Sequence, residues 1–314
     1  MPNEDNGALS PPADLSVELA GVRLKNPVVA VSGCFGFGRE YGEWFDLGRL
    51  GGICAKGLTL RPRKGNPPPR AAETPMGMLN SVGLQNPGVE VFLRDELPFL
   101  RRFDTAVIAN ISGGDPAEYA EMAGLIGDAA DALEVNISCP NIKAGGLQFG
   151  ADPALAAEVT AAVKNRAKCP AIVKLTPNVT DIAAIARAVW DAGADGLSLI
   201  NTLTGLRIDP VTRRPVLRMN TGGLSGPAVL PVALRCVWQV SGLGLPILGM
   251  GGVSTALEAA EMMLAGASAV GVGTALFRDP LSALNIVQGL AAFAAEQGIA
   301  RIRELTGGIR PWET

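Results

Sequence analysis

The hydrophobic and polar positions of this chain follow two alternating patterns. Short apolar runs rich in β-branched residues end at glycine, proline or polar residues, as buried parallel strands do. Longer segments between the runs carry apolar residues at helical spacing. The runs predict eight strands, at residues 28–31, 53–56, 106–111, 133–136, 171–175, 196–200, 246–250 and 269–272.

The segments between the runs predict helices. Asp152 and Asp181 are the expected N-caps of two of them, and Pro153 suits a first helical position. Strands and helices that alternate in this way predict a parallel (β/α)8 barrel, a TIM barrel, rather than an open doubly wound sheet. No G-x-G-x-x-G opens a helix after the first strand, which disfavours a Rossmann domain. The expected helices span residues 41–47, 89–102, 116–126, 152–166, 181–192, 225–241, 257–265 and 279–297.

Several segments fall outside this alternation. Residues 15–24 alternate around Gly21 and predict a small N-terminal hairpin that plugs one end of the barrel. We expect residues 1–314 to form a single domain, with residues 1–14 loosely ordered. The insertion after the fourth strand is expected to act as a lid. Irregular insertions follow strands two, four and six, at residues 59–88, 142–151 and 203–224.

Composition supports a globular fold and narrows the partners. Of the 314 residues, 48% are apolar and 18% are charged, and the net charge is −3. No basic stripe stands out, which disfavours nucleic acid as a partner. The longest uncharged run, residues 236–257, is broken by Pro246 and several glycines, so it does not predict a membrane span. We expect a soluble, cytoplasmic protein without a signal peptide.

The cysteines and histidines limit the chemistry. None of the five cysteines stands in a C-x-x-C spacing, which predicts free thiols in a reducing compartment. The same spacing argues against zinc or an iron–sulfur cluster in this chain, and no metal site is expected. The chain has no histidine, so acid–base chemistry falls to Cys, Lys, Tyr, Asp or Glu.

Polar and small residues gather where the predicted strands end. The carboxyl ends of barrel strands line one face, where barrel enzymes place their active sites, so we expect these residues to surround one site. Glycines follow the last two strands, at the usual phosphate position of such barrels, and predict a phosphate-bearing cofactor. The residues at strand ends are Ser32, Lys56, Asn110, Asn136, Lys174, Asn201, Gly251 and Gly273.

Cys139 follows the fourth strand, between Asn136 and Asn141, with Pro140 directly after it. A lone cysteine in a soluble protein is most often a small buried hydrophobe. Two amides able to fix a flat polar ligand, and a proline that forces a turn, favour a place at the chemistry instead. Lys56 poses a similar choice, between a structural ion pair and a ligand contact, and its place at the end of a buried strand favours the ligand.

Motifs along most of the chain carry a family likeness. In order they are residues 55–57 (AKG), 80–88 (NSVGLQNPG), 136–141 (NISCPN), 173–175 (VKL), 200–202 (INT), 223–227 (GLSGP), 250–253 (MGGV) and 273–274 (GT). With this set the chain resembles dihydroorotate dehydrogenases of class 1, the flavin barrels of pyrimidine (UMP) biosynthesis. Residues 85–88 look like those of class 1B, the NAD-linked type. Class 2, the membrane-bound quinone type, carries serine where this chain has Cys139.

The resemblance implies oxidation of dihydroorotate to orotate with one FMN per chain. Cys139 would be the base at C5, hydride would pass from C6 to N5 of the flavin, and Lys174 would stabilise charge on the reduced ring. The implied cofactor-binding residues are Ser32, Lys56, Gly57, Asn110, Asn136, Lys174, Ile200, Gly226, Gly251, Gly252, Gly273 and Thr274. The implied substrate-binding residues are Lys56, Asn80, Ser81, Val82, Gly83, Leu84, Asn136, Asn201 and Thr202.

The resemblance also implies a partner. In class 1B, electrons pass to a second subunit that carries a 2Fe–2S cluster and FAD and reduces NAD, within a heterotetramer built on a homodimer. This chain lacks the cysteines for such a cluster and would be the catalytic subunit.

Four alternatives stay open at this point. Two are flavin barrels: the fumarate-linked class 1A enzyme and a barrel similar to dihydropyrimidine dehydrogenase. The others are a colourless phosphate-binding barrel and a nucleotide dehydrogenase with a cysteine nucleophile that uses NAD directly. A flavin spectrum, and binding of orotate against uracil, would separate most of them.

Overall fold

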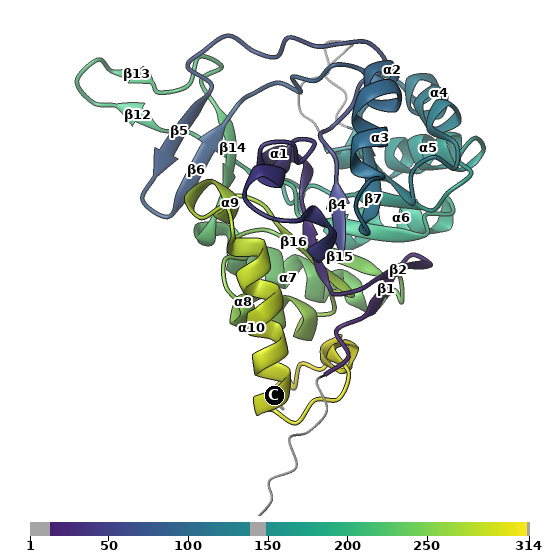
Figure 1. Ribbon diagram of the computed structural model, residues 1–314. Coiled ribbons are helices and arrows are strands. Elements are labelled where there is room, and N and C mark those ends of the chain that lie inside the picture. The colour runs from purple at the N-terminus through teal and green to yellow at the C-terminus, as the bar shows by residue number, and fades with distance from the viewer. Residues whose placement is uncertain (1–12, 139–148, 313–314) are drawn as a thin grey trace, which may run out of the picture.

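Eight parallel strands close into a barrel, as the sequence predicts (Figure 1). The computed structural model describes residues 13–138 and 149–312. Each strand pairs with its neighbours in chain order, and the last strand pairs with the first. In order, the barrel strands are β3 (Val28–Ala30), β4 (Gly52–Cys54), β7 (Ala106–Ile111), β8 (Ala132–Asn136), β9 (Ala171–Lys174), β10 (Gly196–Leu199), β15 (Ile247–Met250) and β16 (Ala269–Val272).

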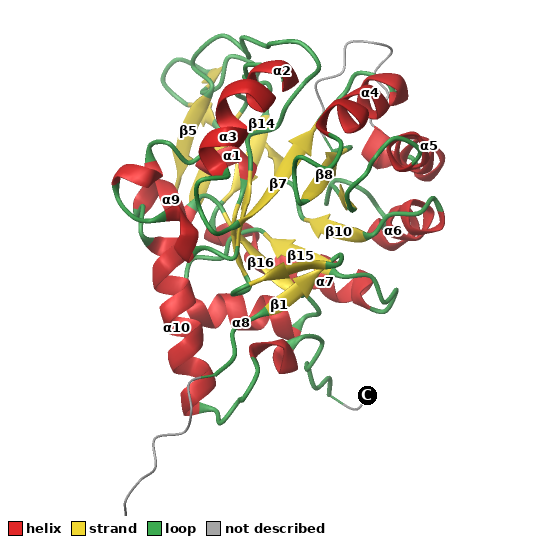
Figure 2. Cartoon of the chain, turned by 45° about the vertical axis from the view of Figure 1, so that its right-hand side comes forward, coloured by secondary structure: helices red, strands yellow, loops and turns green. Residues whose placement is uncertain are grey.

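Helices surround the barrel (Figure 2). Asp152 accepts hydrogen bonds from two backbone N–H groups of the first turn of its helix, and Asp181 does the same for the next, so both predicted caps are confirmed. Where the predicted segments form long helices, the observed helices begin and end within a few residues of the expected positions. They are α4 (Pro116–Ile126), α5 (Pro153–Lys164), α6 (Ile182–Asp191), α7 (Leu230–Ser241), α8 (Ala256–Leu264) and α10 (Ser282–Glu296).

Two helix predictions were wrong in detail. Residues 41–47 form no α-helix: the chain makes 3-10 turns at Tyr41–Glu43 and Leu47–Arg49, and Asp46 caps the second by accepting from the N–H of Gly48. The first helix instead follows β3 directly, as α1 (Ser32–Phe35).

The predicted helix at residues 89–102 contains a wider turn. It runs as α2 (Val89–Val91), a π-helical segment at Phe92–Glu96, and α3 (Leu97–Leu100). Pro98 has no N–H to continue an α-helical hydrogen-bond ladder, so the turn before it widens.

The insertions after β4 and β10 are not irregular, which corrects the prediction for both. They meet in a four-stranded antiparallel sheet with the order β11–β14–β6–β5. The strands are too short to show a period, and β14 pairs with β6 from the other insertion, so no local pattern reveals the sheet. Its strands are β5 (Ala71–Thr74), β6 (Gly77–Asn80), β11 (Leu203–Gly205) and β14 (Gly222–Ser225), beside a small hairpin of β12 (Ile208–Asp209) and β13 (Arg214–Pro215).

The N-terminal hairpin forms as predicted, from β1 (Val17–Leu19) and β2 (Val22–Leu24). Its turn residue Ala20 lies against Gly196, the first residue of β10, which places the hairpin at the amino ends of the barrel strands. The opposite end is therefore open for a site. The insertion after β8 lies largely outside the described residues, and so do residues 1–12. Within the described part of the chain, no helix is long and apolar enough to cross a membrane.

Candidate functional site

A cavity of about 350 Å³ lies at the carboxyl ends of the barrel strands. Seven of the eight strands contribute to its lining from their last residue or from the residues directly after it, through Ser32, Lys56, Asn136, Lys174, Ile200, Gly251 and Gly273. The sheet formed by the two insertions supplies a wall, with Met78 and Asn80 from β6 and Leu224 and Ser225 from β14. The cavity is thus built jointly by the barrel and by its insertions.

The described side chains that line the cavity carry a positive charge. Lys56 and Lys174 line it, and no aspartate or glutamate is among its described lining residues. Lys174 is only 6% exposed, so little solvent screens its ammonium. Such a cavity favours anionic ligands, including a carboxylate or a phosphate.

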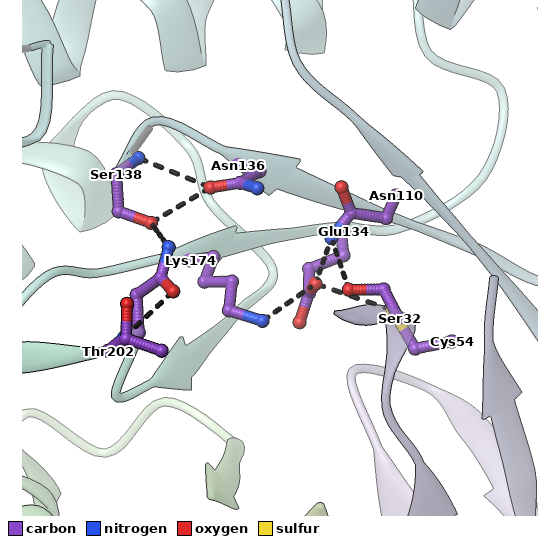
Figure 3. A network of polar contacts seen from close by, with 9 residues as sticks. Ser32, Cys54, Asn110, Glu134, Asn136, Ser138, Lys174 and Thr202 are labelled. Carbon is purple, nitrogen blue, oxygen red and sulfur yellow. Dashed lines mark hydrogen bonds and ion pairs between the residues drawn. The ribbon is translucent and has the colours of Figure 1, made fainter. Parts of the chain in front are cut away.

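A buried polar network lies beneath one wall of the cavity (Figure 3). Glu134, in the middle of β8, is fully buried, and its Oε2 lies 3.3 Å from Nζ of Lys174. Asn110 donates from Nδ2 to the same carboxylate oxygen. The same Nδ2 also donates to Oγ of Ser32, at a distance of 3.3 Å. Cys54 donates from Sγ to Oε2 of Glu134 at 3.3 Å. The network ties two cavity residues, Ser32 and Lys174, to one buried carboxylate.

A second chain of hydrogen bonds orients the amides of the cavity (Figure 3). Asn201 donates from Nδ2 to Oγ of Ser138 at 2.5 Å, and that hydroxyl donates to Oδ1 of Asn136 at 2.8 Å. The N–H of Thr202 donates to Oδ1 of Asn201 at 2.8 Å. Because its oxygen is engaged, Asn136 keeps its amide N–H groups for a ligand, and they suit a carbonyl or carboxylate oxygen.

Glycines after β15 and β16 form a close-fitting backbone cradle. A Cβ on Gly252 would lie 2.8 Å from the backbone N of Leu230, and one on Gly273 would lie 2.9 Å from Cγ2 of Val31. Gly251 and Gly252 also have φ angles of +126° and +84°, which side chains rarely adopt. The backbone N–H groups of Gly252, Gly273 and Thr274 donate to no described residue. They are therefore available to an anion such as a phosphate.

Cys34 is a thiol of the cavity wall that the sequence did not single out. It follows β3 in α1, lines the cavity, and lies near Thr274 and the two lysines. Burial raises its pKa to about 11, and the smaller effects of Thr274, Lys56 and Lys174 act in the opposite direction. It is therefore protonated at neutral pH.

Most of the predicted site residues that the structure describes lie together in this cavity, and two of them, Asn110 and Ser81, do not line it. Asn110 is fully buried behind the wall and is connected to the cavity through Ser32 and through Glu134 and Lys174, whereas Ser81 is not among the lining residues. Cys139 lies outside the described residues. The predicted residues that line the cavity are Ser32, Lys56, Gly57, Asn80, Val82, Gly83, Leu84, Asn136, Lys174, Ile200, Asn201, Thr202, Gly226, Gly251, Gly252, Gly273 and Thr274.

Sequence analysis missed Cys34, Ser225 and Glu134. Ser225 accepts a 2.8 Å hydrogen bond from the hydroxyl of Thr274, which links the insertion sheet to the end of β16. Ser225 could have been predicted as a site residue, because it belongs to the GLSGP motif at residues 223–227. Glu134 could also have been predicted, because it is a lone charged residue inside an apolar strand. A buried charge needs a partner.

Comparison with known proteins gives the family. A family model described as dihydroorotate dehydrogenase matches residues 14–293. The chain belongs to the dihydroorotate dehydrogenase family. It is 54% identical over 299 residues to the dihydroorotate dehydrogenase B (NAD(+)) catalytic subunit of Pelobacter propionicus, covering 94% of this chain and 98% of that one. It is also 54% identical over 303 residues to the protein of the same name from Geobacillus kaustophilus, covering 96% of each.

The enzymes of this family are oxidoreductases that depend on a flavin. The cavity fits a flavin mononucleotide in two respects. The crowded glycines and available N–H groups after β15 and β16 suit a phosphate, and the ammonium of Lys174 suits a ring that gains negative charge.

Proposed function

We propose that this chain is the catalytic subunit of an NAD-linked dihydroorotate dehydrogenase, which oxidises dihydroorotate to orotate in pyrimidine synthesis. The relatives that bear this name match nearly the whole chain. The observation that carries the proposal is the charge of the cavity, which two lysines line without any carboxylate among the described lining residues. Substrate and product are both anions with a carboxylate, and the cofactor phosphate is an anion too.

FMN is the proposed cofactor, bound once per chain. Gly251, Gly252, Gly273 and Thr274 would hold its phosphate, and Gly57, Ile200 and Gly226 would contact the rest of it. When bound, it would accept the hydride that leaves C6 of dihydroorotate. Lys174 would face the ring and stabilise negative charge there, because its ammonium is buried and weakly screened.

The amides of the cavity are the proposed substrate clamp. The hydroxyl of Ser138 holds Asn136 and Asn201 in fixed orientations and leaves the N–H groups of Asn136 for a carbonyl or carboxylate oxygen of the pyrimidine. Lys56 would pair with the substrate carboxylate. The backbone of residues 80–84, together with Thr202, would enclose the planar ring from the side of the insertion sheet.

Cys139 is the proposed base that takes the proton from C5. Replacement by alanine removes the proton acceptor and leaves the described cavity wall intact, so Cys139→Ala should remain yellow and bind orotate. Its flavin should be reduced by dihydroorotate at least about 100-fold more slowly than in the parent protein, within the range that general base catalysis supplies. Anaerobic stopped-flow measurement of flavin bleaching gives the rate.

The matched control is Cys169→Ala, which changes a thiol that is absent from the cavity lining. It should reduce its flavin at the parent rate. Near-parent bleaching by Cys139→Ala would remove Cys139 from the role, and a purified parent protein without flavin absorption would overturn the proposed function itself.

A partner subunit is proposed for the electrons that leave the flavin. The word "subunit" in the relatives' names supports a partner, which we propose carries a 2Fe–2S cluster and FAD in a heterotetramer. Co-expression with a candidate subunit of that kind should give dihydroorotate-dependent reduction of NAD. Turnover with fumarate by the chain alone would favour the class 1A alternative, and tighter binding of uracil than orotate would favour the dihydropyrimidine alternative. We place the assembly in the cytoplasm, where free thiols such as Cys34 and Cys54 persist.

A further inference from the structure

Glu134 is a buried charge that the proposed reaction does not yet use. It sits in the middle of β8 and is 0% exposed, among the buried residues Leu133 and Val135 of the same strand. Its side chain reaches Cys54 on β4, which is not a neighbour of β8 in the barrel. It therefore points into the barrel interior, toward the side chains of Cys54 and Asn110 (Figure 3).

Its hydrogen bonds are distributed unevenly between its two oxygens. Oε2 accepts from Nδ2 of Asn110, Sγ of Cys54 and Nζ of Lys174, whereas Oε1 has no hydrogen-bond partner among the described residues. Three donors from three different strands thus converge on one atom. The carboxylate is held in one orientation, and with it the ammonium of Lys174.

Stability alone does not account for this carboxylate. A buried ion pair is often no more stabilising than apolar residues of the same volume, because both charges lose their hydration. Two of the partners of Glu134 are instead connected to the cavity. Lys174 lines the cavity directly, and Asn110 also donates to Ser32, which lines it too.

We infer that Glu134 is a positioning residue that fixes the ammonium of Lys174 at the cavity wall and offsets its charge, thereby setting the reduction potential of the bound flavin. This inference rests on the proposed flavin function. Glu134 itself does not line the cavity, so it acts through Lys174.

The charge balance of the network gives the sign of the effect. The Cys54 thiol stays neutral, because burial first and the charge of Glu134 second raise its pKa well above the usual value. The charges of Glu134 and Lys174 therefore sum to zero at the cavity wall, where the flavin would bind. Replacement of the carboxylate by an amide of the same shape leaves one net positive charge. A positive charge stabilises the negative charge gained on reduction, so the potential should rise.

The test is the midpoint potential of the flavin in Glu134→Gln, measured by dye equilibration on the purified, flavin-loaded protein. We expect the equilibrium between oxidised and reduced flavin to shift at least tenfold toward the reduced form, a rise of ~30 mV for a two-electron couple. Glu134→Asp keeps the charge and should return the potential toward the parent value. An unchanged or lowered potential in Glu134→Gln would overturn the inference.

Ser198→Ala is the matched control. Ser198 is fully buried, lies in register with Lys174 on the adjacent strand β10, and has a hydroxyl without a hydrogen-bond partner among the described residues. Its replacement perturbs the same barrel interior without changing charge, so it should leave the potential at the parent value. A change in the midpoint potential as large as that of Glu134→Gln would mean that altered packing causes the effect, and it would contradict the inference.

Cys54→Ala decides the matter if Glu134→Gln yields no folded protein. It removes a neutral hydrogen-bond donor to Oε2 of Glu134 at a residue that does not line the cavity. The negative charge of the carboxylate is then less stabilised by hydrogen bonds and offsets more of the positive charge of Lys174. Its potential should fall below the parent value, and no change would contradict the inference. The flavin spectrum of the parent protein separates the two proposals: without flavin the proposed function fails, whereas bound flavin with an insensitive potential refutes the role of Glu134 alone.

Discussion

At the scale of single residues, Cys34 shows how position decides the reactivity of a thiol. It lies in the cavity wall within reach of Thr274 and of the fields of Lys56 and Lys174, which all favour the thiolate. Burial outweighs them and raises the pKa from 9.0 to about 11. A cavity thiol near two lysines is thus kept neutral.

This environment predicts slow alkylation of Cys34 in the folded protein. At pH 8, a pKa two units above the ordinary value lowers the thiolate fraction, and with it the rate, about 100-fold relative to the unfolded chain. The rate should rise about tenfold per pH unit until the pH approaches 11, and the free energy of unfolding should fall between pH 9 and 11, where only the unfolded thiol ionises. Iodoacetamide labelling read by peptide mass spectrometry, with and without urea, measures the rate. Equal rates in both states would contradict the burial argument.

The residues of the site that the sequence predicts share one trait. Ser32, Lys56 and Lys174 each end or follow an apolar strand, where a polar group is visible against its neighbours. Asn110 looks the same in sequence yet faces the buried side of the network. Its exact depth depends on how the strands stagger around the barrel, which a single strand does not reveal.

At the scale of elements, glycines allow the two insertions to meet. β6 and β14 come from different insertions and pair in the register that sets Met78 opposite Ser225. A Cβ on Gly77 would lie 1.9 Å from the carbonyl oxygen of Ser225, and one on Gly223 would lie 2.0 Å from Oγ1 of Thr202. The sheet, and the cavity wall it forms, requires these positions to lack side chains.

Gly77→Ala should therefore separate β6 from β14. Overpacking of this kind costs about 1–3 kcal/mol, and the cost should appear mainly as local opening of the insertion sheet. We expect faster limited proteolysis within residues 59–88 and 203–225 and weaker binding of orotate, because Asn80 and Leu224 leave the cavity wall. Gly242→Ala is the control, since a Cβ there meets nothing within 4 Å. Identical proteolysis of the two variants would contradict the account.

The elements themselves were predictable to different degrees. The strands of the barrel and the helices α4 to α6 follow from local runs, periods and caps such as Asp152 and Asp181. The insertion sheet could not be predicted in this way, because β14 and β6 form by pairing with each other and show no strand pattern in their own sequences. The π-helical turn at Phe92–Glu96 was not predicted either, because the apolar spacing of this segment still resembles that of an α-helix. The turn depends on Pro98.

At the scale of the whole molecule, the two ends of the described chain close on each other. The N–H of Asp14 donates to the carbonyl of Ala300, and the N–H of Ile302 donates back to the carbonyl of Asp14, both at 2.9 Å. The C-terminal segment then continues against α8, where the N–H of Gly307 donates to the carbonyl of Met263. Residues 301–309, which lie beyond the segment that the family model matches, thus act as a structural clasp between the first and last described parts of the chain.

Ile302 anchors this clasp, and its truncation should destabilise the whole barrel. Its side chain is fully buried, whereas Ile309, further along the same segment, is 43% exposed. Ile302→Ala should lower the free energy of unfolding by about 2–5 kcal/mol, because a buried side chain is replaced by a cavity. Ile309→Ala should change it by less than about 0.5 kcal/mol. Urea denaturation of both variants measures the difference, and the flavin spectrum should be unchanged in both, because neither residue lines the cavity. Equal stability of the two variants would mean that the segment only rests on α8, and that the barrel is closed without it.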